Sequence, residues 1–403
     1  MPYDPPPCAA FVIQTQALRP RHDSPPSLPS LATLGAAWSA YQPLGFQYLV
    51  VLASGGLAVV LLARAQRLTE LRCHPLWLLP LLFWLWMALS MLWSVAPPRD
   101  IVGHLWHYVL PLWLLPLART MQPADAQRAL RHFIVISAVA ALLLPWLLPG
   151  RITGNYRIAF SLLLALAAAL AVIEVIAAER TRQQRAAWLV AALFCAVGLA
   201  LQDRRTGMLA LPLLLGALAW ARQRSWWRRM ALLGVVTLAA LLVWQFSPVV
   251  QSRFAEGISE LRAYQPEGEV ASSWGMRLRL LEVSAQMFLE RPFSGHGVGA
   301  WLRLWQERAP GGELLQAHTT PHSEYLLVAV QGGAVGLLLF LVALTAFGVA
   351  ALRRGRDADA ALLVWLAFGF AGLFNVVLRD AKFALPLLML GAIAWAASRR
   401  PSF

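Results

Sequence analysis

The sequence predicts an all-α, polytopic integral membrane protein with about 12 transmembrane helices. Of its 403 residues, 59% are hydrophobic and 13% are charged, whereas soluble domains have about 45–50% apolar and about 25% charged residues. Apolar runs recur from about residue 44 to residue 398, and about 20 helical residues cross the hydrocarbon core of a bilayer. The runs are rich in Leu and Ala and lack period-two alternation, which indicates helices rather than strands.

Eleven segments are long and apolar enough to be predicted as spans. They are 44–63, 76–96, 101–118, 132–148, 158–178, 187–202, 207–221, 230–247, 323–351, 360–378 and 383–398. The segment 30–46 is a candidate for a further short or kinked helix. Arg19 and Arg21 favour a cytoplasmic N-terminus, which requires an even number of crossings before a cytoplasmic C-terminus. We therefore expect twelve spans.

The basic residues indicate topology rather than nucleic-acid binding. The net charge is +14, and every basic residue except Lys382 is an arginine. The arginines lie between the apolar runs, and every second connection holds two to four of them. By the positive-inside rule these connections are cytoplasmic, and the others, including one long loop over 248–321, are outside.

This topology divides the chain into five parts. Residues 1–29 are Pro-rich and predicted to be a disordered cytoplasmic tail rather than a signal peptide. Transmembrane helices over 30–247 precede the large outer loop 248–321; helices over 322–398 and a cytoplasmic C-terminus at 399–403 follow. The loop is predicted to hold two amphipathic helices joined by a tight turn at a glycine cluster. No long internal repeat is visible, which speaks against an inverted-repeat transporter.

Several arginines lie on the outer side, where the positive-inside rule disfavours them. The short outer connections hold Arg151, Arg157, Arg204, Arg205, Arg379 and Lys382. Converging guanidinium groups suit a phosphate or pyrophosphate, which arginine meets with paired hydrogen bonds. The alternative is that each side chain simply reaches the membrane interface by itself.

Two histidines precede the span at 323–351. The spacing of His318 and His322 would suit a metal, but Pro321 interrupts a continuous helix and no further ligand lies at a suitable spacing, so we expect no metal. We expect Pro321 to open the helix, with Thr319 or Thr320 as N-cap and His322 in the first turn. A neutral imidazole there can take a proton from a hydroxyl group; a solvated interfacial histidine is the alternative.

Three further groups of residues have sequence signals that are less specific. Glu324 is placed either to orient His322 or simply to begin the helix. His104 and His107 share a face of the third span and are candidates for lining the same cavity. Gly332 and Gly336 have the small-residue spacing that lets membrane helices approach closely.

These residues resemble the O-antigen ligase family, within the larger O-antigen ligase and polymerase superfamily. His322-Ser323, nine residues, Gly333, two residues and Gly336 resemble its H-[N/S/Q]-x9-G-x-x-G pattern. Arg205-Thr-Gly-Met-Leu209 looks like its R-x3-L element, and residues 272–301 are similar to the region that opens its large periplasmic loop. That region places Arg277 on the motif arginine, although Leu281 replaces the usual tryptophan.

The resemblance implies glycosyl transfer at the periplasmic face of the bacterial inner membrane. The implied donor is a polysaccharide on undecaprenyl pyrophosphate, the implied acceptor is a sugar hydroxyl of lipid A core, and the implied transfer is inverting without metal, nucleotide sugar or other cofactor. His322 is then the catalytic base, and Arg205, Arg277 and Arg157 bind the donor pyrophosphate. Glu324, His318 and Arg204 are candidates for supporting positions, and the partners are membrane lipids, with no nucleic acid.

Three alternatives remain open. An O-antigen polymerase uses the same donor chemistry but extends the lipid-linked glycan. A protein O-oligosaccharyltransferase tends to carry extra outer domains. A transporter of lipid-linked sugars would line a path accessible from both sides, whereas the unusual arginines here are expected on one side.

Overall fold

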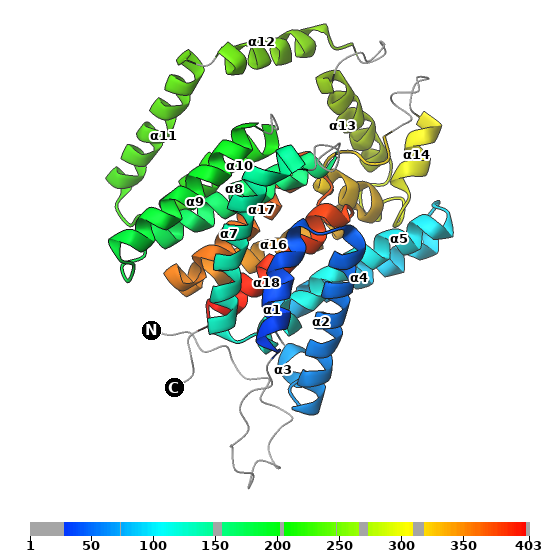
Figure 1. Cartoon of the computed structure of the whole chain (residues 1–403). Coiled ribbons are helices and arrows are strands. Elements are labelled where there is room, and N and C mark those ends of the chain that lie inside the picture. The colour runs from blue at the N-terminus through cyan, green and yellow to red at the C-terminus, as the bar shows by residue number, and fades with distance from the viewer. Residues whose placement is uncertain are drawn as a thin grey trace.

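The computed structural model describes residues 28–72, 74–147, 155–201, 205–246, 248–265, 273–308 and 318–399. Every element within these residues is a helix, which confirms the all-α fold class (Figure 1). The predicted tail at 1–29 lies almost wholly outside the described residues, as do most of the C-terminal residues 399–403.

The predicted apolar segments coincide with helices. Their bounds are α2 Leu44–Arg64, α4 Pro75–Leu89, α5 Pro98–Tyr108, α6 Leu114–Thr120, α7 Pro123–Leu147, α8 Asn155–Ile176, α9 Arg182–Leu201, α10 Arg205–Arg222, α11 Trp226–Phe246, α16 Glu324–Arg354, α17 Asp359–Phe374 and α18 Ala381–Ala397. The predicted span 101–118 is not one continuous helix: the 3-10 turn Leu110–Trp113 separates α5 from α6. Pro111 lies in this turn and has no N–H with which to continue the α-helical hydrogen bonds.

Seven segments of the described chain are long and apolar enough to cross a membrane, and one of them, Glu324–Phe374, contains both α16 and α17. Thr206–Arg222 and Ala381–Ala397 are shorter apolar helices. These segments confirm a polytopic membrane protein. The extra helix expected within 30–46 is α1, Ser30–Trp38, with nine residues. At 1.5 Å per residue α1 is about 14 Å long, about half the hydrocarbon thickness, so the count of twelve spans stays a prediction.

Contacts between helix ends define two opposite ends of the bundle. At one end, Arg222 of α10 binds Asp359 of α17, and Arg131 of α7 binds Glu174 of α8. At the other end, Ser94, beyond α4, donates a hydrogen bond to the carbonyl of Val298 at 2.7 Å. We call these the arginine-rich end, which the sequence predicts to be cytoplasmic, and the loop end.

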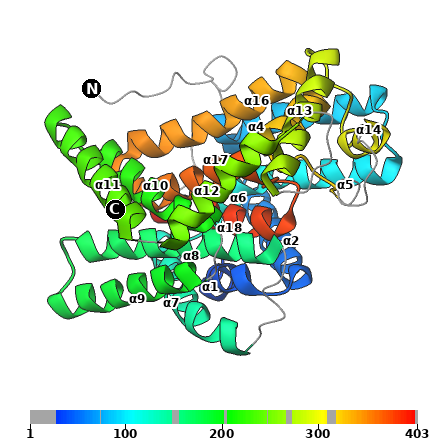
Figure 2. The same ribbon diagram turned by 90° about the horizontal axis from the view of Figure 1, so that it is seen from above.

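The loop end carries the helices of the long connection: α12 Pro248–Ala263, α13 Ser273–Glu290 and α14 Trp301–Arg308. α11, α12 and α13 form an arch beside the bundle (Figure 1), and α13 and α14 lie near the start of α16 (Figure 2). α14 buries Trp301, Leu304 and Trp305 and exposes its polar face. A turn over 291–300 joins α13 to α14, as the glycine cluster predicts.

Small residues let the central helices approach closely. Alanines of α8, including Ala165, Ala167 and Ala169, are fully buried. A Cβ atom on Gly198 of α9 would lie 2.5 Å from the Cβ of Ala141 in α7. Membrane helices associate through such close packing, because surrounding lipid is as apolar as the helix faces.

Two glycine substitutions distinguish the effect of helix packing on protein stability from the effect of helix propensity. Gly198→Ala creates an overlap with Ala141, whereas a Cβ on Gly216 of α10 has nothing within 4 Å. We expect Gly198→Ala to destabilise the protein by about 1–3 kcal/mol, and Gly216→Ala to stabilise it by about 1 kcal/mol through helix propensity. Thermal unfolding in detergent measures both. Equal shifts of the two melting temperatures would contradict the α7–α9 packing.

Candidate active site

The start of α16 holds His322 in an unusual backbone conformation. α16 begins at Glu324, and the Ser323 side chain caps it by accepting the N–H of Leu326. The prediction that Thr319 or Thr320 caps a helix opened by Pro321 is therefore wrong. His322 stands in the connection before the helix, with φ +53°, a left-handed conformation that non-glycine residues seldom adopt. Such conformations persist where surrounding contacts impose them, often at functional sites.

His322 has His318 as its hydrogen-bond partner. Nε2 of His322 and Nδ1 of His318 lie 3.3 Å apart, and the ring planes meet at 72°. Although Pro321 separates the two residues in sequence, the backbone turn at His322 brings their rings together. When His322 Nε2–H donates to His318, the Nδ1 of His322 remains free to accept another proton.

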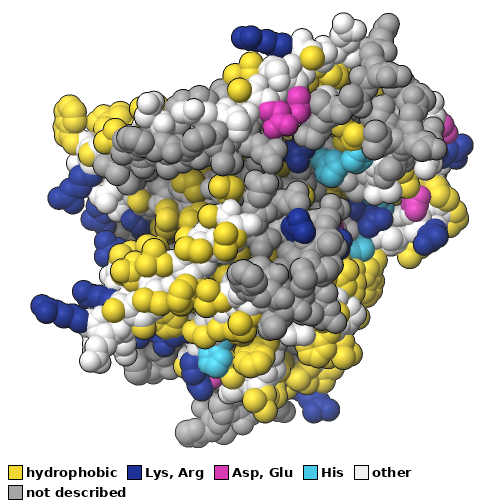
Figure 3. Space-filling model, turned by 45° about the horizontal axis from the view of Figure 1, so that its top comes forward, with side chains coloured by type: hydrophobic (Ala, Val, Ile, Leu, Met, Phe, Trp, Pro, Cys, Tyr) yellow, Lys and Arg dark blue, Asp and Glu magenta, His cyan; other side chains and the backbone are white. Residues whose placement is uncertain are grey.

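Arg277 of α13 lowers the pKa of His322. The Arg277 side chain is exposed, and its positive charge reaches His322 strongly enough to affect its pKa. Burial, then His318, then Arg277 lower the pKa of His322 to about 4, so the imidazole is neutral near pH 7. Burial also lowers the pKa of His318. Figure 3 turns the loop end towards the viewer and shows histidine side chains beside basic ones.

Glu324 has a different environment from the one expected of a residue that orients His322. Its side chain is fully buried, and its Oε2 accepts the N–H of Leu378 at 2.8 Å. Its own N–H donates to the carbonyl of Asn375. Glu324 therefore fastens the connection between α17 and α18 to the start of α16, while His318 contacts His322.

The predicted pyrophosphate-binding arginines lie at helix starts of the same end. Arg157 is the third residue of α8, and Arg205 is the first of α10. A Cβ on Gly207 would lie 2.5 Å from the carbonyl of Ser161, one turn beyond Arg157, so the two helix starts are adjacent. Lys382 of α18 places its Nζ 5.1 Å from the ring centre of Tyr156. Arg204 lies outside the described residues.

The two histidines of α5 belong to a buried polar network. Nδ1 of His104 lies 3.0 Å from the amide nitrogen of Gln331 in α16, and Tyr108 donates to the Gln331 oxygen. His107 contacts the Tyr48 hydroxyl at 2.9 Å. Gln331 was not among the residues predicted from the sequence, although a glutamine seven residues into an apolar helix is a signal for a polar partner in a neighbouring helix.

A break in α16 receives the turn between α13 and α14. Gly333 leaves the helical conformation, with φ 65° and ψ −165°. Across the break, His296 N–H donates to the carbonyl of Val330 and Gly297 N–H to that of Gln331, each at 2.9 Å. In the other direction, Ala334 N–H donates to the carbonyl of Pro292 at 2.7 Å. The turn thus replaces backbone bonds that the helix loses.

Glycine is required where these backbones meet. A Cβ on Gly333 would lie 2.1 Å from the carbonyl oxygen of Phe293, and one on Gly295 2.4 Å from that of Gln331. Gly332 and Gly336 pack instead against Met87 and Trp86 of α4, in keeping with the predicted small-residue spacing. Gly332 and Gly336 therefore serve contact between helices, whereas Gly333 serves docking of the loop.

The arrangement provides a neutral base under the influence of one cationic group, Arg277. In the described chain no group of three or more His, Cys, Asp or Glu lies close enough to hold a metal ion. His322 can accept a proton, and Arg277 can bind an anion. The site thus has the groups needed to deprotonate a hydroxyl next to a negatively charged leaving group.

Comparison with known families supports the resemblance. Residues 190–341 match the family model described as O-Antigen ligase. The matched region includes α10, α13, the turn at 291–300, His322 and the break at Gly333. No curated protein matches the chain.

Substituting Gly333 tests the docked turn. We expect Gly333→Ala to destabilise the loop end, because the new Cβ meets the Phe293 carbonyl in a left-handed conformation. Limited proteolysis should then cut faster within 291–300. Gly56→Ala is the control, since nothing lies within 4 Å of a Cβ there. Wild-type protection of the turn in Gly333→Ala would contradict the interpretation.

Proposed function

We propose that the chain is an O-antigen ligase, because residues 190–341 match the O-antigen ligase family model. The superfamily comprises enzymes that process lipid-linked glycans. The proposed donor is a polysaccharide on undecaprenyl pyrophosphate, and the proposed acceptor is a sugar hydroxyl of lipid A core. The proposed location is the bacterial inner membrane, with the loop end facing the periplasm.

The observation that carries the proposal is the environment of His322. Its imidazole is largely buried, bonds to His318, and feels the charge of Arg277 from the loop. A base of this kind is useful only if a proton donor and an anion meet there. An acceptor hydroxyl and a pyrophosphate leaving group supply both.

The proposed reaction is a single displacement. The neutral His322 takes the proton of the acceptor hydroxyl as its oxygen attacks the anomeric carbon of the donor sugar. The new glycosidic C–O bond forms while the bond from that carbon to the pyrophosphate oxygen breaks. The bonding electrons leave with undecaprenyl pyrophosphate, and His322 returns its proton to solvent. Attack opposite to the leaving group inverts the anomeric centre.

The arginines are proposed to stabilise the leaving group. Arg277 approaches from α13, and Arg157 and Arg205 stand at the starts of α8 and α10. Positive charge placed where negative charge develops lowers the barrier, since the groups need not reorganise during the reaction. His318 is proposed to position His322 and to accept its Nε2–H, which stabilises the protonated ring. Glu324 is proposed to hold the α17–α18 connection in place.

Reconstituted transfer tests the base. We expect His322→Ala to reduce transfer from lipid-linked glycan to lipid A core by about 10²–10⁴-fold, the usual contribution of a general base. Arg277→Ala should reduce transfer by about 10²–10³-fold, because a positive charge that stabilises the leaving group is lost. Arg353→Ala, exposed at the arginine-rich end, is the control and should stay near wild type.

The products of the same assay distinguish the alternatives. Undiminished transfer by His322→Ala would contradict the assigned base. Lengthening of the lipid-linked chain without transfer to lipid A core would show a polymerase. Transfer to a protein hydroxyl would show an oligosaccharyltransferase, and movement of donor across vesicles without a new glycosidic bond would show a transporter.

The pH dependence of transfer tests separately whether the charge of Arg277 lowers the pKa of His322. Because the pKa of His322 is lowered to about 4, its basic form persists well below pH 6, and transfer should fall only as the pH drops through about 4. Arg277→Gln removes a positive charge that holds the pKa down, so the acidic limb should move to higher pH. Arg353→Gln should leave the limb unchanged. Identical limbs in wild type and Arg277→Gln would contradict the coupling.

A further inference from the structure

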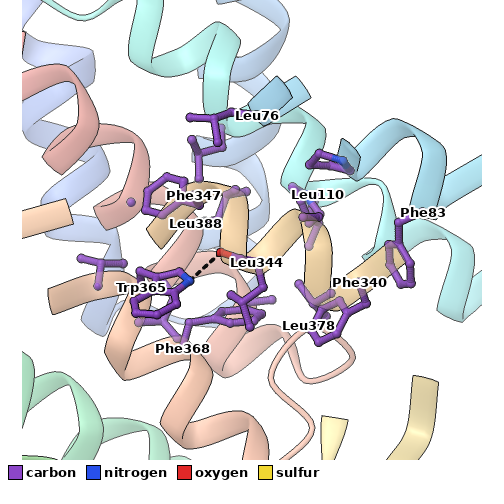
Figure 4. A pocket seen from close by; sticks show the side chains of 18 residues that line it. Leu76, Phe83, Leu110, Phe340, Leu344, Phe347, Trp365, Phe368, Leu378 and Leu388 are labelled. Carbon is purple, nitrogen blue, oxygen red and sulfur yellow. Dashed lines mark hydrogen bonds between the residues drawn. The ribbon is translucent and has the colours of Figure 1, made fainter. Parts of the chain in front are cut away.

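An apolar cavity lies between the helices of the bundle, and its lining reaches Leu378, whose N–H binds Glu324. Its volume is about 130 Å³, and α4, α16, α17 and α18 line it together with the turn before α6. Figure 4 shows Phe83 and Phe340 at one end and Leu76, Phe347 and Trp365 at the other. The catalytic proposal uses none of these residues.

The cavity offers hydrocarbon surroundings to a ligand. The indole N–H of Trp365 on its wall already donates to the carbonyl of Leu344 at 2.6 Å. Leu344, Phe347 and Trp365 are half-buried, so the wall extends to the outer, lipid-facing surface of the helices. A hollow of this chemistry at the lipid boundary suits an alkyl chain.

The cavity points towards the arginine-rich end. Along α16, Phe347 precedes Arg354 by seven residues, or about 10 Å of helix. Leu114 precedes Arg119 in α6, and Leu76 follows His74 by two residues. In α18, likewise, Gly391 precedes Arg399, whereas α4 begins at this end and has its basic residue before its cavity residues. One end of the cavity therefore faces positive charge.

Three arginines gather at this end, and we call them the basic cluster: Arg119, Arg354 and Arg399. Arg354 donates to the Ser398 hydroxyl at 2.7 Å and lies 3.9 Å above the centre of the Trp395 ring. Arg399 donates to the carbonyls of Arg119 and Met121. The Nε of Arg399 is buried and has no hydrogen-bond partner.

The basic cluster carries more positive charge than its carboxylates balance. In the part of the chain that the structure describes, Glu70 is the carboxylate paired with it, 3.8 Å from Arg119, and Glu70 also pairs with Arg67. Burial, then Arg119 and Arg354, lower the pKa of Arg399 to about 10 and that of His74 to about 4. The cations therefore repel one another, and an anion would relieve this repulsion.

We propose that the cavity and the basic cluster together bind one anionic glycerophospholipid of the adjacent leaflet. Its phosphate lies against Arg354, Arg399 and Arg119, and one acyl chain enters the cavity between α4, α16 and α18. Arginine binds phosphate oxygens with paired hydrogen bonds, and anionic lipids attract basic residues at the cytoplasmic surface. This proposal does not depend on glycosyl transfer.

The polyprenyl chain of the donor is the competing occupant. Its pyrophosphate is proposed to bind at the loop end, so its chain would enter from the opposite side and would gain nothing from the basic cluster. Dependence of binding on Arg354 and Arg399 therefore separates the two lipids.

Native mass spectrometry of the delipidated, full-length protein tests the head-group site. We expect phosphatidylglycerol to bind more tightly than phosphatidylcholine with the same acyl chains. Arg354→Gln combined with Arg399→Gln should weaken phosphatidylglycerol binding by roughly tenfold or more and leave phosphatidylcholine unchanged. Arg353→Gln, on the exposed neighbour, is the matched control, and Arg354→Lys should retain part of the preference.

A second pair of variants tests the cavity. Ala343 lines it, whereas the preceding residue, Val342, is exposed. Ala343→Trp should fill the cavity and weaken binding of both phospholipids, and Val342→Trp should not. Ala343→Leu gives a smaller filling should the tryptophan variant fail to fold, which its melting temperature reveals.

Three outcomes would overturn the proposal. Equal binding of phosphatidylglycerol and phosphatidylcholine would remove the head-group site. An arginine double variant that binds phosphatidylglycerol like wild type would do the same. Undecaprenyl phosphate that displaces phosphatidylglycerol and is insensitive to the arginine substitutions would assign the cavity to the donor chain.

Discussion

The loop end depends on the backbone hydrogen bonds exchanged between the break in α16 and the turn at 291–300. A membrane helix cannot leave N–H and carbonyl groups unpaired in hydrocarbon, because each costs several kcal/mol. At Gly333 the helical pattern is interrupted, and His296, Gly297 and Pro292 supply the missing partners. The break and the turn therefore require one another. This mutual requirement fixes α13, and with it Arg277, beside the start of α16.

The same contacts link the loop to the first half of the chain. Ser90 and Ser94, at the end of α4, both bond to Val298, and the Trp86 indole N–H donates to the carbonyl of Gly332 at 2.8 Å. α4 thus packs on α16 and holds the turn as well. On the N-terminal side of the break in α16, Glu324 binds the α17–α18 connection. His322 lies two residues before Glu324, next to this contact.

The sequence predicted the membrane helices well, because length and apolarity decide them. It also singled out His322, Arg277 and the glycines as candidates, since their order and spacing are specific, and the roles assigned to His322 and Arg277 stay predictions. The sequence did not predict features that depend on contacts with a neighbouring segment. The N-cap is Ser323 rather than a threonine. Two alternatives were open for Glu324, and its bond to the Leu378 N–H favours a part in holding the helix start. The break at Gly333 was missed because, in one dimension, a glycine for docking resembles a glycine for helix packing.

The two ends of the bundle hold positive charge for different purposes. At the loop end, Arg277 acts on a neutral His322, and we propose that Arg277 and the arginines at the starts of α8 and α10 bind a leaving pyrophosphate. At the arginine-rich end, ion pairs such as Arg222–Asp359 fasten the helices, and the basic cluster is left with excess charge. The central claim is that His322 and the loop-end arginines form one donor site. A cryo-EM map of the protein in nanodiscs with undecaprenyl pyrophosphate tests this most directly. We expect pyrophosphate density within about 3 Å of the Arg277 guanidinium. This density should lie between α13 and the starts of α8 and α10, and His322 should face it. Density bound elsewhere, with Arg277 and His322 free of contact, would contradict the account.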